Sequence, residues 1–417
     1  MVFIIFGLII RLLLIFSFSS FDINNHLSWS QDLVNRGFPG FYETISKEVY
    51  CCLYPNYPPL ILYIFYPFFL LKNVIFNLGW WLNIHLSVFP SNIIFFLEKK
   101  EMVLGLMKLP AIIFDLGLFF LLFLFAKKIT PKSKKNWLWV FYFILLNPVF
   151  IYLSSLWGQV ESVNLFLIFT SVYLLLYSRQ AMLSLLFFIL ALLIKPTALI
   201  FLPVYLIYFL KKFDMKKLLT SFLVGNVIFW LMFLPFYKSG NVLFFPYLTY
   251  WQKIISGQSM PFVTNSAFNF WSVFPFLSHV KDQSLFLNLF SYRVLGVLIT
   301  IILYLFVILR NIKKIRQETT FSKVAFLTGF SFIMFFTRMH ERYFIYLLPF
   351  LFLIVLKEKK YLIWLISCSI IFFLNVYYSW SVPYADFIGI LKNNFTVSLI
   401  SSLNVFLFFK LLLKMNG

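Results

Sequence analysis

Residues 21–29 read FDINNHLSW and directly follow the first apolar run of the chain, at 3–18. The stretch places one carboxylate, Asp22, where a membrane helix is expected to emerge into water. Later clusters of polar side chains fall in turns between apolar runs. If each run crosses the membrane, these turns lie on the same side of the membrane as Asp22. The pattern therefore predicts that these turns form one site at a membrane surface, organised around Asp22.

The composition indicates an integral membrane protein. Of the 417 residues, 62% are hydrophobic and only 12% are charged, whereas soluble domains are about half apolar and about a quarter charged. The apolar runs recur along the whole chain without the alternation of a transmembrane barrel, and no loop exceeds about fifty residues. We therefore predict an all-α, polytopic membrane helical bundle that forms one domain over residues 1–417.

The apolar runs predict about 13 to 14 transmembrane helices, several of them short or re-entrant. The first run contains Arg11 and lacks the charged segment and cleavage site of a signal peptide, so we interpret it as a membrane helix. The segment 74–97 could instead lie in the membrane interface. The predicted spans lie near residues 3–18, 58–71, 74–97, 102–126, 137–153, 160–177, 181–194, 197–210, 217–236, 286–309, 322–337, 343–356, 361–377 and 395–413.

The net charge of +21 is explained by membrane topology. With the N-terminus inside, most of the 35 lysines and arginines fall on the inner side, chiefly in the loops at 127–135, 211–217, 310–323 and 357–360. This is the positive-inside bias of membrane proteins. The lipid bilayer is thus a predicted partner, and nucleic acid is not.

Two outer loops, at about 17–57 and 237–285, are expected to form a roof over the site. Some predicted spans have only about 14 residues, or roughly 21 Å of helix against a hydrocarbon core of about 30 Å. Short spans draw their outer turns below the surface, where charge is tolerated if it lines a hydrated cavity. The sequence therefore predicts a polar pocket recessed into the outer leaflet.

Asp22 has two interpretations. A carboxylate at this depth could take a proton from an acceptor hydroxyl as a general base. It could also cap a helix over about 23–36 that ends at Gly37. One carboxylate oxygen would remain free in the second case, so the two roles are compatible.

Asp115 lies in the middle of the apolar segment KLPAIIFDLGLFF, with Lys108 seven residues before it on the same helical face. A buried acid in a membrane helix is costly and is usually functional or paired. The competing interpretation is a structural ion pair with a neighbouring helix.

The outer turn SSLWGQVES at 154–162 contains Trp157, Gln159 and Glu161. An aromatic ring for stacking beside an amide and a carboxylate for hydroxyl groups is typical of sugar binding. Trp157 could equally be an interfacial anchor.

Four potential cations lie on the outer side, against the positive-inside bias: Lys195, Arg338, His340 and Arg342. They need an anionic partner, and at headgroup depth a lipid phosphate fits. The alternative is that they pair only with the protein's own Asp115, Glu161 and Glu341.

No cofactor is predicted. The chain has no D-x-D, P-loop, dinucleotide fingerprint or H-E-x-x-H, and its four histidines lack ligand spacing. A divalent metal stays an open possibility.

Taken in order, these motifs resemble the GT-C superfamily of polytopic glycosyltransferases, in particular prokaryotic relatives of the GPI-anchor mannosyltransferases and of the dolichyl-phosphate-glucose glucosyltransferases. Glu161 departs from the family pattern, where Asp is more frequent. The residues that carry the resemblance are Asp22, Trp29, Tyr57-Pro58-Pro59, Lys108, Asp115, Trp157, Gln159, Glu161, Lys195-Pro196, Asn265, Ala267, Phe268, Asn269, Trp271 and the segment from Arg338 through His340, Glu341 and Arg342 to Tyr343.

The resemblance implies an inverting hexosyltransferase, with mannose or glucose as the sugar. It implies a polyprenyl-phosphate sugar donor and a glycan, lipid or protein acceptor on the extracytoplasmic face, in the plasma membrane of a prokaryote or the endoplasmic reticulum of a eukaryote. Asp22 would be the catalytic base. The cations Lys195, Arg338, His340 and Arg342 would hold the donor phosphate. The other motif residues, among them Tyr57, Asn265 and Asn269, would support the substrates.

Two other functions stay open. A transporter or flippase for lipid-linked sugars would use internal repeats and charges near the midplane, whereas the polar clusters here fall mainly at one face. A non-catalytic scaffold would not need outer cations, but a lipid-binding pseudoenzyme would.

Overall fold

The computed structural model describes residues 2–46, 54–133, 140, 143, 145–257 and 260–416, with side chains only from residue 5 to residue 415. Most of the described residues are helical, and their strands form one two-stranded ribbon, β1 (Leu285–Phe286) with β2 (Phe290–Ser291). Six described helices are long and apolar enough to cross a membrane, and four more are apolar but shorter. The all-α, multi-pass membrane fold is confirmed.

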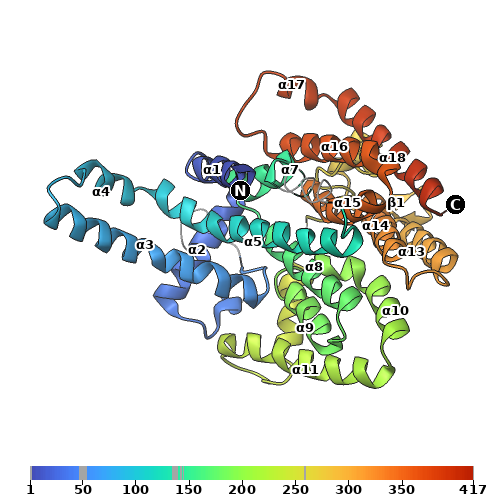
Figure 1. The fold of residues 1–417 in the computed structure, drawn as a ribbon, viewed down its shortest axis with the longest axis horizontal. Coiled ribbons are helices and arrows are strands. Elements are labelled where there is room, and N and C mark those ends of the chain that lie inside the picture. The colour runs from blue at the N-terminus through green and yellow to red at the C-terminus, as the bar shows by residue number, and fades with distance from the viewer. Residues whose placement is uncertain are drawn as a thin grey trace.

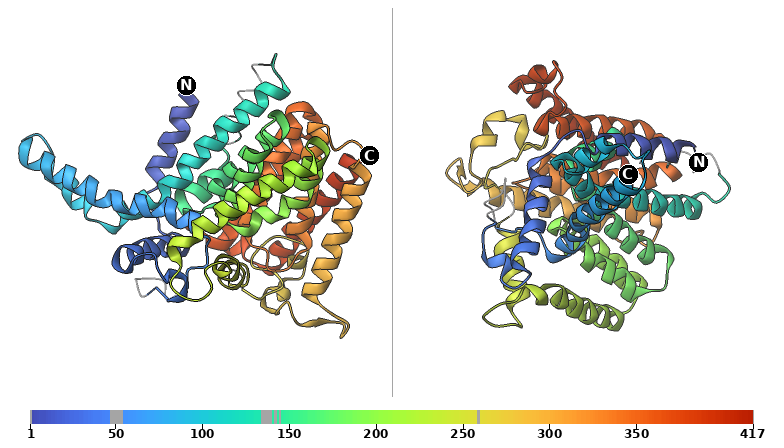
Figure 2. Two further views of the ribbon diagram at one scale, coloured as in Figure 1. Left: turned by 90° about the horizontal axis from the view of Figure 1, so that it is seen from below. Right: turned by 90° about the vertical axis from the view of Figure 1, so that its left-hand side faces the viewer.

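The helices pack as one bundle, with an arm formed by α3 and α4 projecting from it (Figure 1). The segment between α11 and α13 gathers at one end of the bundle (Figure 2). The helices are α1 (Val2–Leu14), α2 (Phe21–Arg36), α3 (Pro59–His85), α4 (Ser91–Leu97), α5 (Lys100–Ile129), α7 (Pro148–Ile151), α8 (Glu161–Tyr177), α9 (Ala181–Leu192), α10 (Leu202–Lys212), α11 (Met215–Phe233), α12 (Phe245–Thr249), α13 (Tyr292–Asn311), α14 (Glu318–Phe335), α15 (Leu348–Lys357), α16 (Leu362–Trp380), α17 (Ile388–Leu391) and α18 (Asn394–Asn416).

The structure differs from the predicted spans at two places. The predicted spans at 58–71 and 74–97 are joined, because α3 continues to His85 and is followed only by the short α4. The predicted span at 137–153 lies partly outside the described residues, and its described part ends in α7 and a π-helical turn, Tyr152–Trp157.

Helix α2 begins two residues earlier than the cap interpretation of Asp22 requires, at Phe21 rather than at residue 23. The side chain of Ser20 is the N-cap and accepts from the backbone N–H of Ile23 at 3.2 Å. Gly37 ends the helix with φ +76°, as expected for a left-handed C-terminal residue. The capping role of Asp22 is therefore wrong, and both its carboxylate oxygens are available to other groups.

A buried ion pair and a hydrogen bond fix the position of α1 relative to α5 and α8. Arg11 Nε lies 3.2 Å from Asp115 Oδ2, and Ser162 Oγ donates to Asp115 Oδ1 at 2.6 Å. Both charged side chains are fully buried. Since Asp22 follows α1 and Glu161 precedes Ser162, this contact helps to bring the turns that carry Asp22 and Glu161 to the same end of the bundle.

The ammonium group of Lys108 closes the end of α1. It donates to the backbone carbonyls of Ile15 and Phe18, which follow the last helical residues, where carbonyl groups lack partners within the helix. Lys108 and Asp115 are thus structural residues that make separate contacts.

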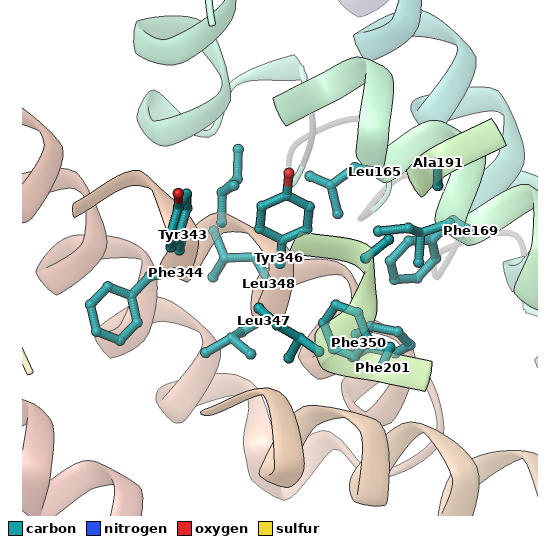
Figure 3. Packing of buried hydrophobic residues seen from close by; sticks show 14 of the residues in the cluster. Leu165, Phe169, Ala191, Phe201, Tyr343, Phe344, Tyr346, Leu347, Leu348 and Phe350 are labelled. Atoms are coloured by element: carbon teal, nitrogen blue, oxygen red, sulfur yellow. The ribbon is translucent and has the colours of Figure 1, made fainter. Parts of the chain in front are cut away.

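The segment 338–347 is held by the core on one side and by the outer loop on the other. Its 3₁₀ helix, Glu341–Leu347, continues into α15, and aromatic side chains such as Tyr346 and Phe350 pack among Phe169 and Phe201 (Figure 3). The Asn265 N–H donates to the carbonyl of Met339 at 3.0 Å. These contacts give the polar residues 338–342 a defined position.

Candidate functional site

Among the described residues, hydrogen-bond donors reach only one oxygen of the Asp22 carboxylate. Trp157 Nε1 and Gln159 Nε2 both donate to Oδ2, at 3.0 and 2.7 Å. Gly158 lies between the two donors with φ +78°, a conformation that glycine adopts without strain and that lets both side chains point the same way. The other oxygen, Oδ1, faces Arg342 Nη2 at 3.8 Å.

These neighbours keep Asp22 ionised. Burial alone would raise the pKa of Asp22, but the charge of Arg342 and the hydrogen bonds from Trp157 and Gln159 outweigh it, so the pKa lies below its ordinary value. The carboxylate is therefore deprotonated at neutral pH.

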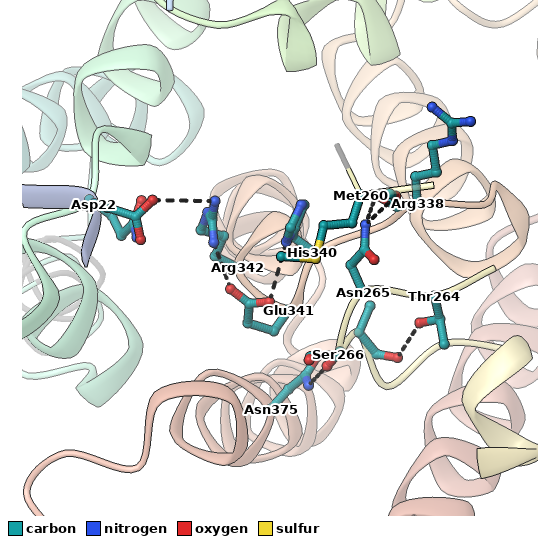
Figure 4. Close-up of polar contacts among 12 residues, drawn as sticks. Asp22, Met260, Thr264, Asn265, Ser266, Arg338, His340, Glu341, Arg342 and Asn375 are labelled. Atoms are coloured by element: carbon teal, nitrogen blue, oxygen red, sulfur yellow. Dashed lines mark hydrogen bonds and ion pairs between the residues drawn. The ribbon is translucent and has the colours of Figure 1, made fainter. Parts of the chain in front are cut away.

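Arg342 connects three carboxylates. Besides its contact with Asp22, its Nη1 donates to Glu341 Oε1 at 2.8 Å (Figure 4). Its Nε lies 3.4 Å from Glu161 Oε1. Lys195 Nζ donates to the same Glu161 oxygen at 2.6 Å. Two basic side chains, Arg342 and Lys195, thus face three carboxylates in a largely buried cluster.

Glu341 stays charged because of its basic neighbours. Burial would raise the pKa of Glu341, but Arg342 and His340 lower it to about 2. Lys195 has a lowered pKa because it is buried, although Glu161 opposes the shift.

Aromatic rings line the same cluster. Lys195 Nζ lies 5.0 Å from the ring centre of Tyr343 and 5.8 Å from that of Tyr57. Trp157 stacks on Trp380 with ring centres 5.4 Å apart, and the Arg342 guanidinium lies 5.9 Å from a Trp157 ring. Such rings give cations a partial partner and offer flat faces to a sugar.

His26 also lies beside this cluster, although the sequence motifs did not predict a role for it. It lies one turn after Asp22 on α2, stacks on Phe65 with ring centres 4.4 Å apart and contacts Trp29 and Tyr57. Burial lowers the pKa of His26 to about 4, although the charge of Asp22 opposes the shift. Its Nδ1 and the Trp29 indole nitrogen are buried without a hydrogen-bond partner among the described residues. The i, i+4 spacing from Asp22 was the available signal.

Arg338 does not join the other three outer cations. Its guanidinium binds Asp282 in bidentate fashion, Nε to Oδ2 at 2.7 Å and Nη2 to Oδ1 at 3.0 Å, and its side chain points away from Arg342 (Figure 4). Asp282 also lies beside the hydroxyl of Thr337. The four potential cations therefore form two groups, and Asp282 is a partner that sequence spacing could not reveal.

An apolar groove of about 650 Å³ opens beside Arg338. We call it the Arg338 groove. Side chains from α13, α14 and the turn before α10 line it, and its charged lining residues are Arg338 and Arg293. It combines a long apolar wall with cationic groups, as an anionic lipid requires.

A second, polar cavity of about 680 Å³ lies on the other side of the segment 337–343. We call it the Asn265 cavity; Asn265, Trp157 and Arg342 line it. Within 337–343, the residues Thr337, Arg338, Met339 and Tyr343 line the groove, whereas His340, Glu341 and Arg342 line the cavity. One backbone segment thus separates an apolar space from a polar one.

The remaining predicted site residues have different surroundings. His340 lies 3.7 Å from Glu341 and joins the Arg342 side of the segment. Asn269 is fully buried and accepts from the backbone N–H groups of Trp271 and Ser272, which is a structural role. Over the described part of the chain, no three His, Cys, Asp or Glu side chains converge as a metal site.

The fold and these contacts define an integral, multi-pass membrane protein with a buried ionic cluster between an apolar groove and a polar cavity. No protein-family model matches the chain, and a search of curated proteins finds no match.

Proposed function

We propose that the protein is an inverting glycosyltransferase that transfers a hexose, mannose or glucose, from a polyprenyl-phosphate donor to an acceptor hydroxyl on the extracytoplasmic face. The observation that carries the proposal is the state of Asp22: it is ionised, held by two donors on Oδ2, and has Oδ1 free of hydrogen bonds. A carboxylate held in this way is suited to accept a proton from a bound hydroxyl.

The two cavities fit the two substrates of such a reaction. The Arg338 groove has the apolar walls and the cations that a polyprenyl phosphate needs. The Asn265 cavity offers amide, hydroxyl and aromatic groups, which suit a polyhydroxylated acceptor. The cluster around Arg342 borders the cavity, and Tyr343, which lines the groove, carries the Lys195 ammonium on its ring.

In the proposed reaction the acceptor hydroxyl loses its proton to Asp22 Oδ1 while its oxygen forms a bond to C1 of the hexose. The bond from C1 to the phosphate oxygen breaks on the opposite face, and its electron pair leaves with the lipid phosphate. Attack from the opposite face inverts the anomeric centre. Arg342, Lys195 and His340 are the groups that would balance the phosphate charge in this water-poor site.

The test is sugar transfer by the purified protein in proteoliposomes, offered a panel of polyprenyl-phosphate hexoses with membrane lipids and lipid-linked glycans as acceptors. Transfer from one donor that is lost in Asp22→Asn and kept in Asp32→Asn supports the proposal. Asp32 is the matched control because it lies on the same helix and its ion pair is with Arg36. Full transfer by Asp22→Asn would refute the base assignment. Movement of the intact lipid-linked sugar across sealed vesicles, without transfer, would show a transporter.

A further inference from the structure

The first turns of α3 lie at the end of the bundle that carries the site. The Tyr63 hydroxyl donates to the carbonyl of Met232 at 3.0 Å, in the last turn of α11. Two residues later, Phe65 stacks on His26 of α2, one turn after Asp22. The N-terminal part of α3 therefore packs against α11 and α2 at the end of the bundle that carries the site.

The last turns of α3 lie at the same end. Gly79 packs so closely on α4 that a Cβ atom there would come within 2.5 Å of Leu97 Cδ1. The adjacent Phe96 meets Phe16 with ring centres 5.3 Å apart, and Phe16 also covers Gly105 of α5. In the sequence Phe16 lies between the end of α1 and Asp22. It therefore lies at the end of the bundle that carries the site.

A helix that crossed the bilayer could not make both sets of contacts. The 16 residues from Tyr63 to Gly79 span about 24 Å of helix, most of a hydrocarbon core of about 30 Å. A crossing helix would thus carry Gly79 toward the inner surface, whereas its neighbours Phe96 and Phe16 are at the outer one. Although α3 is long and apolar enough to span a membrane, it runs sideways along the outer end of the bundle.

The end of this arm is exposed and apolar. From residue 73 to residue 97 the sequence contains no Asp, Glu, Lys or Arg. Lys72 precedes the segment, and Glu98, Lys99 and Lys100 follow it. Large side chains project from it on several sides, with exposed fractions of 60% for Val74, 62% for Ile84, 86% for Val88 and 64% for Phe95. An apolar surface of this kind is not stable in water.

We propose that this outer arm, residues 73–97, lies parallel to the membrane and is covered by lipid at the boundary between headgroups and acyl chains of the outer leaflet. Three features favour lipid over a protein partner. The apolar surface continues the exposed face of the bundle at Leu13 and Phe6 of α1. Trp80 and Trp81 are the side chains enriched at that depth. The flanking lysines match anionic headgroups. Figures 1 and 2 show the arm projecting sideways from the bundle.

Depth measurement on the full-length protein in proteoliposomes tests this inference. Cysteines introduced singly by Val74→Cys, Ile84→Cys and Val88→Cys, in a chain whose Cys51, Cys52 and Cys368 are changed to Ala, would carry a bimane label. Lipids with a nitroxide at a shallow or a deep acyl position would quench it. We expect all three labels to be quenched more by the shallow lipid, at one common depth. Ile302→Cys is the control, because residue 302 is exposed in the middle of α13, and its label should respond to the deep lipid.

Two results would overturn the inference. If α3 crosses the membrane, the labels at 74, 84 and 88 will show progressively changing depth, and the cysteine at 88 will react with an impermeant thiol reagent only from the inner side. If the arm lies in water or against another protein, neither nitroxide lipid will quench the labels while the α13 control responds. Neither outcome depends on whether the protein transfers sugar.

Discussion

Arg342 Nη2 lies 3.8 Å from Asp22 Oδ1, while Nη1 of the same guanidinium donates to Glu341 at 2.8 Å. The longer contact is an ion pair without a hydrogen bond, so Arg342 is held more firmly by Glu341 than by Asp22. An incoming phosphate that draws the guanidinium away from Asp22 would remove the charge that lowers the pKa of this carboxylate. Donor binding would then make Asp22 a stronger base, which couples the two substrates.

Asp22→Asn is predicted to lower turnover by roughly 10²–10⁴-fold, the usual contribution of a general base. The affinity for the polyprenyl-phosphate hexose should change little, because an amide keeps the shape of the side chain and the phosphate ligands are other residues. Single-turnover transfer and donor binding, measured side by side, check this. A matching loss of donor affinity would show that Asp22 binds the donor instead.

Gln159→Leu is predicted to move the acid limb of the pH–rate profile to higher pH. The variant removes the donor at 2.7 Å from Asp22 Oδ2, one of the groups that hold the pKa of Asp22 below its ordinary value. A base must be deprotonated, so activity falls as pH drops through its pKa, and a higher pKa brings that fall at higher pH. Gln180→Leu, on an exposed turn, should leave the profile unchanged. If the acid limb of the pH–rate profile does not move in Gln159→Leu, Asp22 is not the group whose protonation lowers the rate.

Arg342→Lys is predicted to impair transfer although the charge is kept. A lysine cannot contact Asp22, Glu161 and Glu341 together, because those contacts use three different guanidinium nitrogens. We expect both a lower kcat and a higher KM for the donor. The exposed Arg310→Lys on α13 is the control, and equal kinetics for the two variants would contradict the role of the guanidinium.

Arg338→Gln is predicted to raise the KM for the donor with a smaller effect on kcat. Arg338 lines the apolar groove and lies apart from Asp22. Its loss also leaves the fully buried carboxylate of Asp282 without its main partner, so the variant Arg338→Gln/Asp282→Asn is needed to separate donor binding from folding. If the double variant regains wild-type KM, Arg338 is only a structural partner of Asp282.

Arg11→Met is predicted to destabilise the protein by about 3–5 kcal/mol, because it leaves Asp115 as an uncompensated buried charge. The double variant Arg11→Met/Asp115→Leu should recover much of that loss, since replacing a whole buried pair by apolar groups is often tolerated. Thermal unfolding in detergent measures both. An unchanged midpoint in Arg11→Met would show that the pair contributes little to stability.

The sequence by itself determined the fold class and grouped many of the polar residues that the structure brings together. Long apolar runs require helices in a membrane because no other structure satisfies the backbone there, and polar residues beside the ends of apolar runs were placed together correctly for Asp22, Trp157, Gln159, Glu161, Lys195 and Arg342.

Only the tertiary structure decided which side chains pair and how the apolar arm is oriented. Arg11 meets Asp115 across 104 positions and Arg338 meets Asp282 across 56, and nothing in local spacing selects those partners. The sequence of α3 is typical of a span. Its contacts with α11 and α2, and the contact of Phe96 in α4 with Phe16, are the basis for our proposal that it runs along one end of the bundle. Hydropathy reports that a helix avoids water, whereas its direction depends on the neighbours against which it packs.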